Sequence, residues 1–201
     1  MAKSSSYRLP LHRRIEGKTD YYARKALVLS GKPRLVARTS LKNAIAQIIV
    51  AKPRGDEVLI SAHSRELKEY GWNAPDGNIP AAYLTGLLCG LRAKAKGITE
   101  IIFDIGLHSP SKGARIFALL KGVLDAEISV PYSKEKLPDD KRIGGEHIAK
   151  YAENLASNPE EYQFRFAKYL EQKLPPENLP KHFVEIKTEI LAAFKSGGKK
   201  K

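Results

Sequence analysis

The hydrophobic positions in the first third of the chain follow the two-residue period of strands. Residues 34–39 (RLVART) alternate, and residues 44–51 (AIAQIIVA) form a β-branched run a few positions later. The segment PRGD at 53–56 is typical of a tight turn and leads into a third run at 57–62. The pattern predicts a three-strand meander whose second and third strands form an antiparallel hairpin.

The next part of the chain changes to helical spacing. Residues 79–96 place leucines and alanines on one broad face, with Asn78 as a candidate N-cap and Gly97 as a stop signal. Gly86 and Gly90 lie four positions apart in this segment, which predicts close packing of the helix on a sheet.

A strand, a helix and a strand are then expected. Residues 100–105 (EIIFDI) are almost continuously apolar, as in a strand covered on both faces, residues 114–124 have helical spacing, and residues 127–130 supply a short last strand. Strand–helix–strand units pair in parallel through right-handed crossovers. The predicted fold class is therefore α/β, with a mixed sheet of about five strands and flanking helices.

The two ends of the chain differ from this core. Residues 1–19 are polar and basic without a sustained apolar period, which predicts an extended arm, and a short helix is expected at 20–30 with Thr19 or Asp20 as its cap. Beyond residue 131, helices are predicted at 143–155, 159–173 and 180–194, the second capped by Asn158, and the Gly/Lys-rich tail 196–201 is expected to be mobile.

Three parts follow from this division. Residues 1–33 form a basic arm with a short helix and are expected to bind RNA, residues 34–131 form the α/β core, and residues 132–201 form a mainly helical region with a mobile Lys-rich tail.

Positive charge is concentrated in the first part of the chain. The sequence has 35 Lys and Arg against 22 Asp and Glu, a net charge of +13. Residues 1–42 hold 11 basic and 2 acidic residues (net +9), residues 43–130 hold 10 and 9 (net +1), and residues 131–201 hold 14 and 11 (net +3). Such a distribution favours a polyanionic partner at the amino-terminal end.

Other features of the composition bear on the compartment. The chain has no run of 18 apolar residues and no apolar segment typical of a secretory signal, so we expect a cytoplasmic protein without a membrane partner. Cys89 is the only cysteine, which excludes an internal disulfide framework.

Basic and aromatic residues are interleaved over positions 7–34. Cations contact phosphates, and flat rings stack on unpaired bases, so this mixture is typical of RNA contact, although a solvated, disordered tail has the same composition. The loop at 106–113 precedes a helix and presents Lys112 for a phosphate. Because Lys112 is followed by Gly113 and Ala114, the loop lacks the Walker A order, and a structural loop that also contacts RNA is favoured over nucleotide binding.

An enzymatic alternative depends on Asp104, which ends an apolar strand as Mg²⁺-binding carboxylates do in nucleases. Asp76, Asp125 and Glu146 are its only obvious partners, and each has a simpler role in a turn or helix. The five histidines are scattered without metal-ligand spacing. We therefore expect no catalytic residues, no metal, no cofactor and no small-molecule substrate.

Five blocks of the sequence resemble one family of ribosomal proteins. They are GKTDYYARKALVLSGKPRLVART at 17–39, YLTGLLCGLRA at 83–93, FDIGL at 103–107, GARIFALLKGVLDA at 113–126 and RIGGEHIAKYA at 142–152. In this order they are similar to the 5S rRNA-binding protein of the large subunit, the L-eighteen family, in its archaeal form. The likeness spans about residues 7–155.

This resemblance implies a structural role without catalysis. It implies a ribonuclease-H-like motif used as a scaffold, location in the cytoplasmic large ribosomal subunit, and attachment of 5S rRNA to the large rRNA in the central protuberance. The implied partners are these two RNAs and neighbouring ribosomal proteins, including the other 5S-binding protein. A metal-dependent nuclease and an RNA chaperone outside the ribosome stay open as alternatives.

The family's 5S-contacting block matches residues 17–39, and its basic arm matches Arg8, Arg13 and Arg14. Together with the charge and aromatic pattern, it gives the following predicted RNA-binding residues: Tyr7, Arg8, His12, Arg13, Arg14, Lys18, Thr19, Asp20, Tyr21, Tyr22, Arg24, Lys25, Lys32, Arg34 and Lys112.

Overall fold

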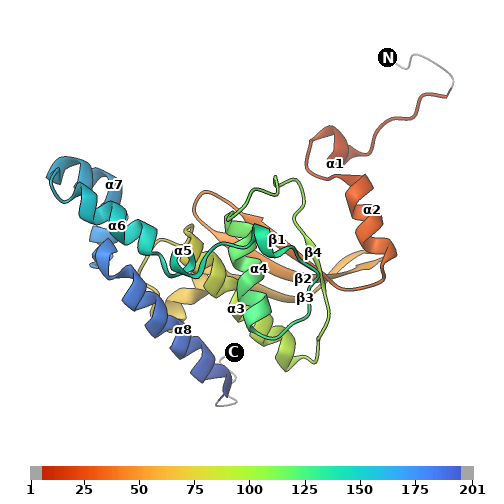
Figure 1. Ribbon diagram of the computed structural model, residues 1–201. Helices are drawn as coiled ribbons and strands as arrows, with labels where there is room; N and C mark the ends of the chain where they lie inside the picture. Colours follow the sequence, from red (N-terminus) through yellow and green to blue (C-terminus); the bar gives the residue numbers. More distant parts are fainter. Residues whose placement is uncertain (1–5, 196–201) are drawn as a thin grey trace.

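The computed structural model describes residues 6–195 of the chain (Figure 1). Strands β1 (Arg34–Thr39), β2 (Ala44–Lys52) and β3 (Gly55–His63) form the predicted antiparallel meander. β2 and β3 shift register between Ile48 and Ile49, which marks a bulge in the hairpin. The predicted strand positions for this half of the sheet are confirmed.

The sheet is mixed and has four strands in the order β3-β2-β1-β4. β4 (Ile102–Asp104) pairs in parallel with β1, as the crossover through helix α3 (Ile79–Ala95) requires. The mixed α/β class is confirmed, but the fifth strand is wrong. Residues 127–130 contribute only an isolated parallel bridge between Glu100 and Ser129, and Glu127 still belongs to the turn that ends α4, where it has a positive φ of 68°.

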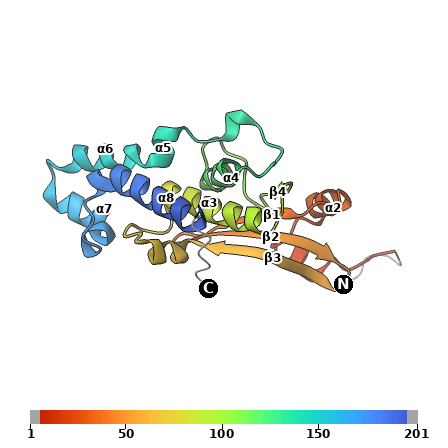
Figure 2. The same cartoon turned by 90° about the horizontal axis from the view of Figure 1, so that it is seen from below.

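Helices α3 and α4 (Arg115–Asp125) cover one face of the sheet (Figure 2). Alternate residues of β1 and β2, such as Leu35, Ala37 and Ile48, are fully buried beneath them. The opposite face carries Arg34, Val36 and Arg38. Helices α3 and α4 therefore leave the face with Arg34, Val36 and Arg38 to be covered by other parts of the chain.

Glycines allow α3 and α4 to cross at close range. A Cβ at Gly86 would lie 2.0 Å from the backbone oxygen of Leu119, and one at Gly90 would lie 2.6 Å from the Cβ of Ala126. Gly122 of α4 makes the reciprocal approach to the backbone of Tyr83. The expected close packing is present, but against α4 and not against the sheet.

The carboxy-terminal region is helical, as predicted. It contains α5 (Asp140–Gly144), α6 (Glu146–Leu155), α7 (Pro159–Glu171) and α8 (Leu179–Lys195). Gly145, with a φ of 87°, divides the single helix expected at 143–155 into α5 and α6. Asn158 precedes α7, but its side chain makes no capping hydrogen bond.

These helices pack on the end of α3 that lies farther from β4, where Tyr83, Phe183 and Ile186 share one cluster of buried residues (Figure 2). Within the described part of the chain, three 3₁₀ segments connect the elements, η1 (Ser64–Tyr70), η2 (Lys134–Lys136) and η3 (Pro176–Asn178). Within residues 6–195 no helix is long and apolar enough to cross a membrane. The tail 196–201, expected to be mobile, lies outside the described residues, and the three-part division of the chain stays a prediction.

Candidate nucleic-acid interface

The basic amino-terminal segment folds into two helices at the end of the sheet opposite α7 (Figure 1). Helix α2 (Tyr21–Leu29) begins at Asp20, whose carboxylate accepts hydrogen bonds from the backbone amides of Tyr22 and Ala23 at 2.9 and 3.2 Å. The predicted helix and its cap are confirmed. The arm before it is not wholly extended, because residues 12–15 form the single turn α1 (His12–Ile15).

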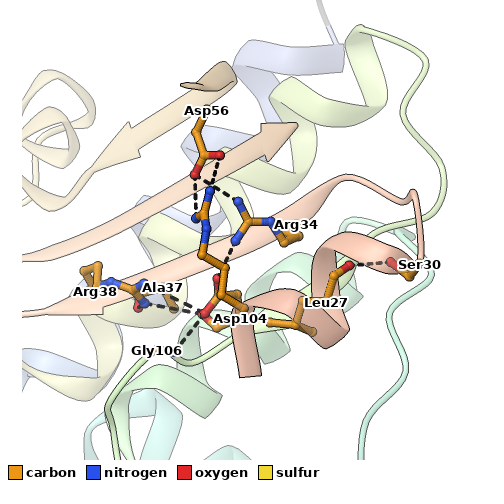
Figure 3. Close-up of polar contacts among 9 residues, drawn as sticks. Leu27, Ser30, Arg34, Ala37, Arg38, Asp56, Asp104 and Gly106 are labelled. Atoms are coloured by element: carbon orange, nitrogen blue, oxygen red, sulfur yellow. Dashed lines mark hydrogen bonds and ion pairs between the residues drawn. The ribbon is translucent and has the colours of Figure 1, made fainter. Parts of the chain in front are cut away.

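A bidentate ion pair attaches α2 to the sheet (Figure 3). The two terminal nitrogens of Arg24 donate to the carboxylate of Asp56 in β3 at 2.8 and 2.6 Å. The fork of a guanidinium matches two carboxylate oxygens, so this pair defines orientation as well as distance. Helix α2 is therefore held in a defined position relative to β3.

The same carboxylate also contacts a buried arginine at the start of β1. Arg34 is only 2% exposed, and its terminal nitrogens donate to Asp56 and Asp104, each at 2.9 Å. Arg38 lies 3.8 Å from the other oxygen of Asp104, which also accepts a hydrogen bond from the backbone amide of Gly106 (Figure 3). One network thus joins α2 to β1, β3 and β4.

The pKa values in the network follow from these contacts. The hydrogen bond from Arg24 and the positive charges of Arg24 and Arg34 hold the pKa of Asp56 below its usual range. In turn, the hydrogen bond to Asp56 raises the pKa of Arg24 further above its ordinary value. Both partners are therefore charged at neutral pH.

A cavity of about 800 Å³ lies between α2 and the face of the sheet that α3 and α4 do not cover. Arg13, Lys18 and Arg38 line it together with apolar residues such as Leu27 and Phe103. Arg13 is fixed there by a hydrogen bond of 2.9 Å from its Nε to the hydroxyl of Thr19. The space between the arm and the sheet is thus lined by both cationic and apolar groups.

The outward surface of the segment is cationic and aromatic. Tyr22 is 88% exposed, and Tyr7 is half exposed. Arg8, Arg14 and Lys25 are exposed and have no acidic partner within residues 6–195. We call these five residues the outer arm surface, and none of their side chains forms a hydrogen bond or ion pair within residues 6–195.

Other predicted residues already have partners in the protein. His12 and Lys18 contact Glu16 at 3.0 and 3.1 Å, Lys32 contacts Glu100, and Lys112 contacts Glu135 at 3.6 Å. These four side chains stay largely exposed, so their pairs are weak surface contacts. Tyr21 is partly buried, while Thr19 and Asp20 serve local hydrogen bonds.

Arg24 and Arg34 differ from the rest of the predicted set. Their guanidinium groups are committed to Asp56 and Asp104, so they position α2 within the fold, and their direct contact with RNA stays a prediction. Sequence reasoning missed these acidic partners, because it places Asp56 only in a turn and Asp104 only in a nuclease alternative. The signal available was a lone arginine opening a strand whose neighbours are apolar, since a buried arginine requires a counter-ion.

The nuclease alternative depends on the same Asp104. This residue is 8% exposed, and its carboxylate is the counter-ion of Arg34. Within residues 6–195 no three His, Cys, Asp or Glu side chains lie together in a group that fits a metal ion. Asp104 thus has a structural role that explains its position.

Comparison with known families agrees with the surface just described. Residues 5–99 match a family model described as "Ribosomal large subunit proteins 60S L5, and 50S L18". This match supports a large-subunit ribosomal protein that binds rRNA and takes part in translation.

The match covers just under half of the chain and includes α1, α2, β1 to β3 and α3. It therefore contains the outer arm surface and the Arg24–Asp56 ion pair. Residues beyond 99, which hold three of the five resembling blocks and all of α5 to α8, lie outside it. Ribosomal protein families of this kind are typically structural and not enzymatic.

Proposed function

We propose that this ribosomal protein binds 5S rRNA through the outer arm surface and helps to attach it to the large rRNA in the central protuberance. One observation supports the assignment above all others. The fold anchors α2 through Arg24 and leaves Tyr22, Arg14 and Lys25 directed outward without acidic partners among residues 6–195. A helix held in place by one set of cations presents a second set to a polyanion.

The chemistry of this surface suits RNA with unpaired bases. Arginine and lysine contact phosphates and give a binding constant that falls with salt, while an exposed tyrosine stacks on any base with about 1–3 kcal/mol per ring. Phosphate contacts fix the register, and stacking adds a preference for loops or bulges over regular duplex. The proposed role is that of a scaffold, without a catalytic step.

The test is binding to isolated 5S rRNA over a range of salt concentrations. Arg8, Arg14 and Lys25 are replaced together by glutamine, which removes three charges and keeps polar side chains in place. If each contacts one phosphate, the slope of log affinity against log salt decreases by about 2 to 3.

The matched control replaces three exposed lysines elsewhere, Lys134, Lys141 and Lys150, which have no acidic partner among the described residues. We expect the control to change the slope of log affinity against log salt by less than about 1, the value for one phosphate contact. Equal slopes for the wild type and the arm variant, or equal effects of the arm variant and the control, would show that the outer arm surface does not bind 5S rRNA.

A further inference from the structure

A second cationic groove lies at the opposite end of the sheet from α2. Its volume is about 530 Å³, and its walls are the turn after β1, the segment of η1, the loop before α3 and the end of α7. Four of its lining residues are basic, Lys42, Arg65, Lys68 and Lys168. We call this the distal groove.

The four cations are available to a ligand. Each is exposed, and none forms a salt bridge within residues 6–195, although Arg65, Lys68 and Lys168 lie close enough to Asp76 for their charges to lower its pKa. Asp76 and Glu171 also line the groove, so its basic residues outnumber the acidic ones by four to two. Burial raises the pKa of the Asp76 carboxyl, while the positive charges of Lys68, Arg65 and Lys168 act in the opposite direction.

Amide groups add neutral donors to the distal groove. Asn43 and Gln172 line it, as does Asn78, which also caps α3 by accepting a hydrogen bond of 2.7 Å from the amide of Ala81. Cations and amides along one concave surface are the groups that contact phosphates and sugars in RNA complexes.

The walls of the distal groove are held together by specific contacts. Arg115 donates to the carbonyl oxygens of Ser40 and Gly77 at 2.9 and 2.7 Å, which joins the turn after β1 to the loop before α3. Asn78 donates to the hydroxyl of Tyr169 at 3.3 Å, which joins the same loop to α7. The groove is thus formed before any ligand binds, which lowers the entropic cost of binding.

Distance separates this groove from the outer arm surface. The groove begins beside Asn43, just before β2, whereas Asp56 lies beside the hairpin at the other end of β2. Nine residues of β-strand span about 30 Å. This is several times the screening length of about 8 Å at physiological salt, so the two surfaces act on their ligands independently.

From these observations we infer that the distal groove binds the phosphate backbone of a large-subunit rRNA segment, separate from the 5S rRNA at the outer arm surface. The inference rests on the proposed function and assigns a surface to its second RNA. Since the chain is a ribosomal protein of the large subunit, rRNA is the polyanion that surrounds it. A protein that attaches one RNA to another requires two such surfaces, and the strands of the sheet hold them apart.

The experiment uses full-length protein, 5S rRNA and full-length large-subunit rRNA. Lys42, Lys68 and Lys168 are replaced together by glutamine. All three are exposed, so we expect no change in thermal unfolding followed by circular dichroism. The Lys134, Lys141 and Lys150 variant is again the control.

The groove variant should bind 5S rRNA with unchanged affinity and salt slope, while binding to large-subunit rRNA loses about 2 to 3 in slope. Raising salt fourfold, from about 50 to about 200 mM, should therefore weaken the wild type about 15- to 60-fold more than the groove variant. In sucrose gradients, the groove variant should no longer link 5S rRNA to large-subunit rRNA, so the two RNAs should sediment separately.

Two results would overturn the inference. If the groove variant loses 5S affinity as the arm variant does, the groove belongs to the 5S surface. If it binds both RNAs like the control, the groove does not bind rRNA and faces protein or solvent. Failure of the proposed function is seen separately, because it depends on the arm variant and 5S rRNA alone.

Discussion

Replacing Asp56 with asparagine tests whether the ion-pair network positions the RNA-binding helix. The change removes one negative charge from between Arg24 and Arg34 and leaves a side chain of the same shape. Asparagine still accepts one hydrogen bond, but it no longer neutralises two guanidinium groups. We expect α2 to be held less firmly and the sheet edge to be destabilised.

The expected cost follows from the ion pairs that the substitution removes. Breaking a fully buried ion pair destabilises by about 3–5 kcal/mol. Here Asp104 still faces Arg34, and the side chain of Asp56 is 27% exposed, so we expect the smaller value of about 2–3 kcal/mol. Urea unfolding measures this loss, and hydrogen exchange at residues 21–29 shows whether α2 is released.

The direction of the change in RNA affinity distinguishes an effect of charge from an effect of helix position. The substitution raises the net charge from +13 to +14 and frees Arg24, so charge alone predicts tighter binding to 5S rRNA. If Asp56 instead positions α2 for RNA binding, the substitution should weaken binding to 5S rRNA. If about half of the lost free energy must be restored when RNA binds, affinity falls about tenfold.

Glu57→Gln is the matched control on the same strand. Glu57 pairs with Lys52 at the surface, with both side chains about half exposed, so its loss should cost under about 1 kcal/mol and leave RNA affinity unchanged. Stability of the Asp56 variant within about 0.5 kcal/mol of the wild type, or RNA binding tighter than that of the wild type, would refute the positioning role.

The same network predicts a pH dependence. The pKa of Asp56 is lowered in the folded protein, so its contribution is fully present above the ordinary carboxyl value of 3.8 and is lost as pH falls through the lowered pKa. The stability difference between wild type and the asparagine variant should therefore be constant near neutrality and vanish in strong acid. A difference that grows as pH falls would contradict the assignment.

Three further predictions concern packing, a histidine and an exposed ring. Gly86→Ala should destabilise the protein by about 3 kcal/mol in urea unfolding, because the new Cβ would lie 2.0 Å from the α4 backbone. Gly144→Ala is the control, since its Cβ would have no atom within 4 Å, and its stability should stay within about 0.5 kcal/mol of the wild type. Burial lowers the pKa of His182, which accepts a hydrogen bond from the amide of Asn73, so the wild type should lose stability as pH falls below 6.5. The variant His182→Gln should lose less stability over the same pH range. An unchanged pH profile of stability would show that His182 does not cause the loss. Tyr22→Ala should leave stability unchanged but weaken 5S binding by about 1–3 kcal/mol, and an unaltered affinity would exclude stacking by this ring.

Local patterns were sufficient to predict most of the fold. The alternation in 34–39 and the turn at 53–56 identify the meander, and Asp20 and Asn78 identify two helix starts, because each of these signals acts over a few neighbouring residues. The last strand was wrong: its first residue, Glu127, lies in the turn after α4 with a positive φ that no local rule assigns to glutamate, and Ser129 forms only an isolated bridge. Gly145 differs, because a left-handed glycine is a local stop signal for a helix, and here it ends α5 within the helix that was predicted as continuous.

The candidate surface was predictable in composition but not in arrangement. Charge and tyrosine spacing identify the amino-terminal segment, yet they treat Arg24, Arg34 and Lys25 as equivalent. Only the fold distinguishes them, because the carboxylates that bind the two arginines come from strands 22 to 70 residues away in the chain. The distal groove was missed for the same reason, since its four cations come from three separate segments of the chain.

Crosslinking within intact large subunits tests the central claim most directly. A photoreactive amino acid in place of Tyr22, which is 88% exposed, reports the RNA that the outer arm surface touches, and one in place of Lys168 reports the ligand of the distal groove. We predict that position 22 crosslinks to 5S rRNA and position 168 to large-subunit rRNA. Crosslinks from position 22 to large-subunit rRNA or protein alone, with none to 5S rRNA, would contradict the account.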